Sequence, residues 1–239
     1  MEEMKLREVI ITDLTRFSTD DKVCVAAVDM NTGECFRPIP YLKNESCAKL
    51  NIQPGSILKG DITRDPSAAN PHIEDASYTN KLKFIGTASA EQFKSILENT
   101  LSNSVASGFG VDFDIGQKHI PVGEVTTCSI ITIKVSPSLL SIHEDQYKPG
   151  KIKASFTDES GHYFSYLSIT DRGFFDYAKK HQDDGKLHDV KNFISSQNEI
   201  YLRIGIGRRW KVSERDGYWL QVNGIYTFPN FLDEIRTYA

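Results

Sequence analysis

The sequence predicts a mainly β protein with a few short helices, folded as two small β-barrels in tandem. Short runs rich in β-branched and aromatic residues recur along the chain, and Gly, Pro, Asn and Asp separate them. Each half carries about five such runs, whereas only a few segments show helical periodicity. That count of short strands is typical of two small barrels, which we place at residues 1–135 and 136–239.

The first half is predicted to contain hairpin-linked strands and one helix. Its strands lie at residues 8–13, 22–29, 34–37, 56–63 and 129–135. The Asn-Thr-Gly tip before residue 34 supplies the positive φ that a hairpin turn needs, and Pro38-Ile-Pro40 ends that hairpin because proline cannot donate to a ladder. A helix is predicted over 89–101, with Ser89 as its N-cap, because apolar residues recur there at helical spacing.

The second half is predicted to repeat this pattern after a connection at 136–150. Strands are expected at 151–156 and 162–169, and a closing hairpin at 201–229. A short helix is expected at 171–180. The polar segment 180–198 is expected to be a loop.

Composition limits the kind of ligand the chain can attract. Hydrophobic residues make up 39% and charged residues 25%, which suits a globular protein with a sizeable core. The net charge is −4, so no global positive field attracts nucleic acid or an acidic membrane. Any anion site must therefore be a local patch. No apolar run of about 18 residues predicts a membrane helix, and the charged start argues against a signal peptide.

The cysteines predict a reduced, cytoplasmic protein. Cys24, Cys35, Cys47 and Cys128 show no Cys-x-x-Cys spacing. Reduced thiols are the ordinary state of such residues in the cytoplasm. We therefore expect no zinc site and no other cofactor.

The stretch 201–229 interleaves cations with large aromatic residues and is the main candidate site. The candidate nucleic-acid-binding residues are Arg203, Arg208, Arg209, Trp210, Lys211, Trp219 and Gln221. Strand alternation turns Arg203 away from Leu202 and Ile204, so Arg203 is expected on an exposed polar face with Trp219 and Gln221. Arginine and lysine would neutralise phosphates, while tryptophan would stack on bases. The alternative is that the same residues only cover and solvate a barrel edge.

Weaker candidates lie in the first half of the chain. They are Arg16, Arg37, His72 and Glu74. His72 and Glu74 could do acid–base work or ligate a metal, but no second His or Cys lies nearby, so a surface turn is expected. Arg37 could contact a phosphate. No catalytic residue and no metal ligand is predicted.

Two Thr-Asp pairs, ending at Asp13 and Asp171, each follow an apolar strand. Two carboxylates at equivalent places could hold a divalent ion. The expected role is instead to cap the backbone where each strand ends.

Several blocks of the sequence resemble, in order, the prokaryotic dual OB-containing domain family. They are Ile-Thr-Asp-Leu-Thr-Arg at 11–16, the hairpin at 25–38, Pro-Gly-Ser-Ile-Leu at 54–58, Pro-His-Ile-Glu-Asp at 71–75, and the stretches 202–208 and 219–229. The resemblance implies two OB-like β-barrels and carries over no catalytic residues. OB folds commonly bind oligonucleotides or oligosaccharides.

Two functions remain open from the sequence. The first is a non-enzymatic dual OB-fold module that binds single-stranded nucleic acid or a nucleotide, for example as a subunit of a bacterial nucleic-acid or defence machine. The alternative is an adaptor that docks onto a partner enzyme, which the acidic charge and exposed aromatics also suit. A third, weaker hypothesis is an enzyme that uses His72 and Glu74. No membrane partner is expected, and the oligomeric state is not predicted.

Overall fold

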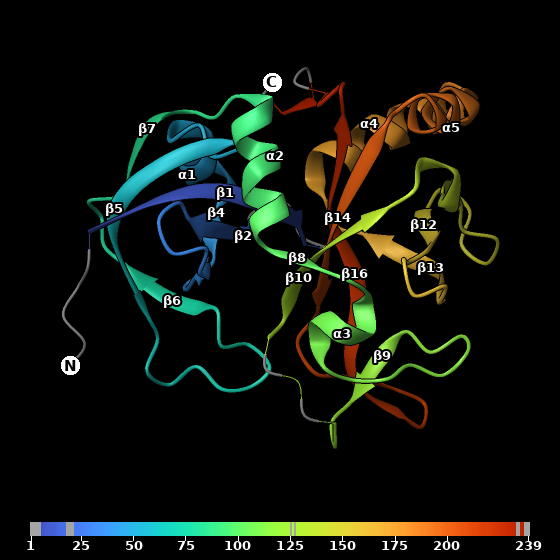
Figure 1. Ribbon diagram of the computed structural model, residues 1–239, viewed down its shortest axis with the longest axis horizontal. Coiled ribbons are helices and arrows are strands. Elements are labelled where there is room, and N and C mark those ends of the chain that lie inside the picture. Colours follow the sequence, from blue (N-terminus) through green and yellow to red (C-terminus); the bar gives the residue numbers. More distant parts are fainter. Residues whose placement is uncertain (1–5, 18–21, 125, 127, 233–234, 237–239) are drawn as a thin grey trace.

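The computed structural model describes residues 6–17, 22–124, 126, 128–232 and 235–236 (Figure 1). Strands dominate, and they form two sheets that lie side by side. The helices are short and lie between the sheets or at their ends. The predicted fold class, mainly β with a few short helices, is confirmed.

The first sheet has the strand order of an OB-like barrel. Its strands are β1 (Leu6–Arg16), β2 (Lys22–Asp29), β3 (Cys35–Pro38), β4 (Leu42–Lys43), β5 (Ser56–Arg64), β6 (Asp75–Tyr78) and β7 (Lys83–Thr87). The long strand β1 pairs with both β2 and β5, while β3 runs parallel to β6 and β6 pairs with β5. The pairings therefore run in a ring around a core that includes Val25, Phe36 and Ile62.

The second sheet follows the same order. Its strands are β8 (Leu101–Ser102), β9 (His119–Pro121), β10 (Ile130–Val135), β11 (Leu140–Glu144), β12 (Ile152–Thr157), β13 (Tyr163–Ile169), β14 (Glu199–Ile206), β15 (Trp210–Val212) and β16 (Arg215–Phe228). A 3-10 turn at Pro137–Leu139 separates β10, which pairs with β14, from β11, which pairs with β12. Together β10 and β11 take the place of β1, and β13 runs parallel to β16 as β3 does to β6.

Sheet membership differs from the division expected at residue 135. Strand β10 and the preceding β8 and β9 all pair within the second sheet. The sheets divide instead near the helix α2 (Ala90–Asn99). The strongly apolar run at 129–135 marks a strand, but nothing local in it shows which barrel that strand joins.

The described ranges contain five α-helices, three of which begin at a side-chain cap. They are α1 (Asn44–Lys49), α2, α3 (Val105–Phe109), α4 (Arg172–Asp183) and α5 (Leu187–Ser195). Ser89 caps α2 in a reciprocal capping box with Gln92, as predicted. The loop expected at 180–198 is wrong, because α5 forms there and buries Val190 and Ile194. No helix in the described ranges is long and apolar enough to cross a membrane.

A third apolar cluster joins the two barrels. It combines Ile10 and Val28 of the first sheet, Tyr201 and Tyr226 of the second, and Phe93 of α2. Figure 1 shows α2 standing between the two sheets. The Tyr226 hydroxyl also donates to a main-chain carbonyl of β1. The two barrels therefore pack as one unit around a shared core.

Candidate nucleic-acid interface

Arg203, the first of the predicted phosphate-binding cations, is buried. It turns away from Leu202 and Ile204, which lie in the core of the second barrel, as the alternation predicts. The first barrel, however, covers that side of β14. The guanidinium lies 2.9 Å from the carboxylate of Asp13 and donates a 2.8 Å hydrogen bond to the hydroxyl of Thr132. With 1% of Arg203 exposed, the expected exposed polar face is wrong at this position.

Arg208, Arg209 and Lys211 lie on the exposed segment between β14 and β16. Arg208 pairs with Asp75 of the first barrel at 2.8 Å. Arg209 pairs with Asp216 at 2.7 Å. The hydrogen bond from Arg209 and, to a smaller extent, the charge of Lys211 lower the pKa of the Asp216 carboxyl. The positive charge of this tip is therefore met largely by carboxylates of the same chain.

Trp219 and Gln221 share the outward side of β16, whereas Trp210 extends into solvent. Trp210 is 66% exposed. The indole N–H of Trp219 donates to the carbonyl of Trp210 at 3.0 Å, and its ring stacks on His119 with centroids 5.0 Å apart. Gln221 lies opposite Ser168 where β16 pairs with β13. The alternation-based grouping of Trp219 with Gln221 therefore agrees with the structure.

The weaker candidates Arg37, His72 and Glu74 are buried in the seam between the barrels. The Glu74 carboxylate accepts hydrogen bonds from the backbone N–H of Ser129 at 2.7 Å and from its hydroxyl at 2.8 Å. Arg37 donates to the same hydroxyl at 3.1 Å. His72 packs edge-on against the ring of Tyr218. The expected surface turn is therefore wrong for His72, and these side chains hold the barrels together.

Burial lowers the pKa of His72 to about 3, and the charges of Arg37 and Arg208 add to this effect. A histidine with this pKa stays neutral near pH 7 and is a poor proton acceptor. Throughout the described ranges, no group of three His, Cys, Asp or Glu residues is placed to hold a metal ion.

Arg16 and the two Thr-Asp pairs meet at the junction of the barrels. The guanidinium of Arg16 lies 3.8 Å above the centre of the Phe175 ring. Asp171 caps α4 by accepting from a backbone N–H and also pairs with Arg236 at 2.7 Å. Capping is therefore confirmed for Asp171 but wrong for Asp13, which lies inside β1 and pairs with an arginine.

The packing of the barrels covers one outer face of the first barrel and leaves the corresponding face of the second open. Val28 of β2 is buried in the shared core, and Cys35 of β3 accepts a hydrogen bond from Arg203. Strands β12 and β13, the counterparts of β2 and β3, lie on the side of the molecule away from the first sheet (Figure 1). In OB folds the second and third strands commonly form the ligand-binding face.

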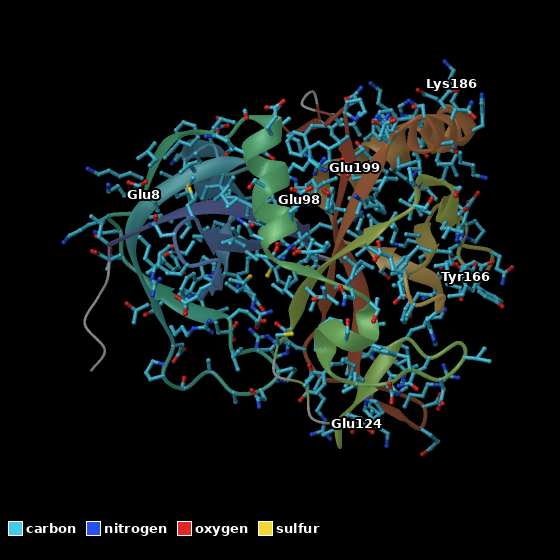
Figure 2. All side chains as sticks on the ribbon, in the orientation of Figure 1. Glu8, Glu98, Glu124, Tyr166, Lys186 and Glu199 are labelled. Atoms are coloured by element: carbon cyan, nitrogen blue, oxygen red, sulfur yellow. The ribbon has the colours of Figure 1, made fainter. Side chains whose placement is uncertain are left out.

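The open face gathers rings and cations from five strands and loops that are distant in sequence. We define it by Lys118, His119, His143, Lys153, Tyr166, Trp219 and Gln221. The rings of Tyr166 and His143 meet edge-on, with their centroids 4.7 Å apart. The amine of Lys118 lies 5.5 Å from the centre of the Tyr166 ring. Lys153 donates a 2.9 Å hydrogen bond to Ser168 on the next strand. Figure 2 shows Tyr166 at the outer edge of the second barrel.

The cations of the open face repel one another. Burial lowers the pKa of Lys118, and the charges of Lys153 and Arg215 lower it further. Burial also lowers the pKa of Lys153, while the carboxylate of Asp145, 3.7 Å away, partly opposes that effect. A bound anion would relieve this repulsion, so the face is electrostatically suited to a phosphate backbone.

Sequence reasoning missed most of the open face. Lys118, His119, His143, Lys153 and Tyr166 were not candidates. The sequence did carry a signal for one of these residues, because the polar–apolar alternation at 151–156 places the side chain of Lys153 on the outer side of the strand. The parallel pairing of β13 with β16, which brings Ser168 beside Gln221, has no local signature.

Comparisons with solved structures give weak similarities. A murine DNA-binding protein bound with double-stranded DNA matches at 9% identity and a TM-score of 0.32, over 92% of this chain and 96% of that chain. The tetrameric p202 HIN2 structure matches at 10% identity and a TM-score of 0.31, over 95% and 94% of the two chains. No curated protein matches the sequence.

The sequence itself matches a family over both barrels. The match to the dual OB-containing domain covers residues 9–225. It begins in β1 and ends in β16, so it includes strands of both sheets described above. The chain therefore belongs to the dual OB-containing domain family.

Proposed function

We propose that this protein is a non-enzymatic module that binds single-stranded nucleic acid on the open face of the second barrel. The observation that carries the proposal is the grouping of Tyr166 and Trp219 with Lys118 and Lys153. Aromatic rings stack on bases and cations follow the backbone in single-strand binding sites. Lys153 and Tyr166 also lie on β12 and β13, the counterparts of the strands that OB folds commonly use for ligands.

The arrangement favours a single strand over a duplex. A base can stack on Tyr166 or Trp219 only when its own face is free, and bases in a duplex cover one another. Because the whole chain carries a net charge of −4, the attraction is confined to the local patch and should be strongly screened by salt. A nucleotide is the smallest ligand that offers both a base with a free face and a phosphate charge.

The competing function is a protein adaptor, and the tip around β15 favours it. Trp210 and Val212 of β15 are 66% and 46% exposed, and Val122, next to β9, is 40% exposed. Strands β15 and β9 pair with the two edges of β16, so these apolar side chains belong to the same end of that strand. Exposed tryptophan of this kind is typical of protein interfaces. In that reading the open face is only solvated surface.

A role in a bacterial nucleic-acid or defence machine, and a cytoplasmic location, are part of the same proposal. The four cysteines are free thiols, which suits a reducing compartment.

Fluorescence anisotropy with a labelled single-stranded oligonucleotide at low salt tests the proposal. The first variant, Lys118→Gln/Lys153→Gln, should weaken binding and reduce the slope of log affinity against log salt by about 1.4, or about 0.7 per phosphate contact. The second, Tyr166→Asn, should weaken binding about tenfold, within the roughly 1–3 kcal/mol of one stacking contact. Asparagine is chosen because Tyr166 has a φ of 56°, which asparagine tolerates.

Matched controls separate the open face from general charge or aromatic content. Lys186→Gln removes an exposed lysine that lies beyond α4 (Figure 2). Phe84→Asn removes a 37% exposed ring on β7 of the first barrel. Both should bind like the wild type. Equal losses in the controls, or no binding by the wild type at low salt, would refute the proposal. Capture of a stoichiometric partner that depends on Trp210 would then support the adaptor.

A further inference from the structure

The loop between β11 and β12 places another exposed ring beside the open face. Tyr147, on this loop, is 79% exposed. The centroid of its ring lies 6.4 Å from that of Tyr166, which stacks on a base in the proposed function. Tyr147 is not among the residues that define the open face. The aromatic surface therefore continues from the strands onto the loop.

Hydrogen bonds within the loop order it. The backbone N–H of Tyr147 donates to the carboxylate of Asp145 at 2.9 Å. The backbone N–H of Asp145 donates to the carbonyl of Lys151 at 2.7 Å, which closes the base of the loop. The backbone N–H of Gly150 donates to the carboxylate of Glu144 at 2.6 Å. Because these bonds exist without a ligand, stacking on Tyr147 costs little additional backbone entropy.

Tyr147 and Tyr166 are oriented to receive two different bases. Their ring planes are inclined at 53° to each other, so a planar base that lies flat on one ring cannot lie flat on the other. Tyr166 is itself fixed, because its backbone N–H donates to the hydroxyl of Ser155 at 3.0 Å and its ring packs against His143. Two ordered rings at this distance suit two adjacent bases of one strand.

A row of polar side chains crosses the open face and leads toward the loop. Strand pairing sets Gln221 of β16 opposite Ser168 of β13, Ser168 opposite Lys153 of β12, and Lys153 opposite His143 of β11. Neighbouring strands are about 4.8 Å apart, which makes this row roughly 14 Å long. A stacked nucleic-acid strand rises about 3.4 Å per nucleotide, so the row corresponds to about four nucleotides.

The loop also brings positive charge to the end of this row. Burial lowers the pKa of Lys153, and the carboxylate of Asp145 opposes that effect. The charges of Lys148 and Lys151 lower the pKa of Lys153 further, so both loop lysines lie close to it. A strand that continues from Tyr166 to the loop therefore keeps its phosphates near cations, as in other single-strand binding sites.

We propose that Tyr166 and Tyr147 stack two adjacent bases of one strand, and that the ligand of the open face is therefore an oligonucleotide rather than a single nucleotide. The strand crosses β16, β13, β12 and β11 and reaches the β11–β12 loop. This inference rests on the proposed function, because it concerns the ligand of the same face. It adds Tyr147 to the binding residues.

Competition against a labelled single strand tests the inference with oligothymidylates of one, two and four nucleotides. Wild-type affinity should rise at least tenfold from one nucleotide to four, since a second base stacks and further phosphates are bound. Tyr147→Ala should weaken binding of the four-nucleotide strand about tenfold, the size expected for one stacked base, and should change the affinity for the single nucleotide less than twofold. Tyr166→Asn should weaken both.

Two control variants separate stacking from other effects. Tyr147→Phe should keep most of the affinity, because the ring and not the hydroxyl stacks on the base. Phe84→Ala removes an exposed ring from the first barrel and should leave every affinity unchanged. Because Tyr147 is an exposed loop residue, Tyr147→Ala should also leave the Tm unchanged.

The outcomes distinguish this inference from the proposed function. Equal affinity for one and four nucleotides, or full binding of the four-nucleotide strand by Tyr147→Ala, would overturn the inference. If Lys118→Gln/Lys153→Gln still weakened binding in that case, the proposed function would stand. A wild type that binds no strand of any length would overturn both.

Discussion

Replacing Arg203 by methionine should destabilise the protein strongly without affecting the proposed nucleic-acid site. Its guanidinium makes two contacts to Asp13, at 2.9 and 3.0 Å, one to Thr132 at 2.8 Å, and one to the sulfur of Cys35 at 3.5 Å. Arg203 and Asp13 are each 1% exposed. Arg203→Met therefore leaves the Asp13 carboxylate in the seam without its counter-charge, while methionine preserves much of the apolar stem.

The expected loss of stability in Arg203→Met follows from the unpaired charge of Asp13. Removing one partner of a buried ion pair costs about 3–5 kcal/mol. For a chain of this size, each 1 kcal/mol lowers Tm by about 2–4 °C, so the expected fall is roughly 6–20 °C. In the Arg203→Met background, Asp13→Asn should recover part of the loss, because a neutral amide costs less to bury than an unpaired carboxylate.

Urea unfolding under reducing conditions measures the free-energy change, because the four cysteines are free. Below the unfolding transition, the folded Arg203→Met protein should bind a single-stranded oligonucleotide as the wild type does. A loss of less than about 1 kcal/mol would refute the structural role of Arg203. A selective loss of oligonucleotide affinity would restore Arg203 as a binding residue.

Three further predictions follow from single contacts. Gly217→Ala would place its Cβ 2.2 Å from the carbonyl oxygen of Ile120. It should lower the free energy of unfolding by about 1–3 kcal/mol and weaken oligonucleotide binding, because it displaces β9. The control Gly123→Ala, whose Cβ would have no atom within 4 Å, should change neither stability nor binding. His72 has a folded-state pKa of about 3, below its ordinary value of 6.5, so the unfolded chain takes up the proton first and stability falls as pH drops from 6.5 toward 3. His72→Phe should remove up to about 1.4 kcal/mol per pH unit of that slope in urea titrations at a series of pH values. Ser89→Ala should cost about 1 kcal/mol in the same assay, because it removes the capping box of α2.

Local signals in the sequence were sufficient for many elements. The Asn-Thr-Gly tip produces the β2–β3 hairpin with Gly33 at a φ of 73°. Ser89 begins α2 as its capping pattern predicts. The missed helix α5 also carries a local signal, since Leu187, Val190 and Ile194 recur at helical spacing. The many charged and polar residues around them led to the expectation of a loop.

The site was harder to predict because its location depends on how the barrels pack. Alternation placed Arg203 on the outer side of β14 correctly, but the first barrel, not solvent, lies on that side. Glu74 and Arg37 were likewise identified as polar residues of interest, yet they bond to Ser129 across the seam. No periodicity shows which outer face a second barrel covers. The open face therefore became visible only from the pairing of strands distant in sequence.

Photo-crosslinking tests the central claim most directly. A single-stranded oligonucleotide that carries 5-iodouracil is bound at low salt, irradiated, and the attached peptides are mapped by mass spectrometry. Binding on the open face predicts crosslinks at Tyr166, Trp219, His119 or His143, which supply its rings, and their loss in Lys118→Gln/Lys153→Gln. Crosslinks confined to Trp210 or to the first barrel, with none on the open face, would contradict the proposed site.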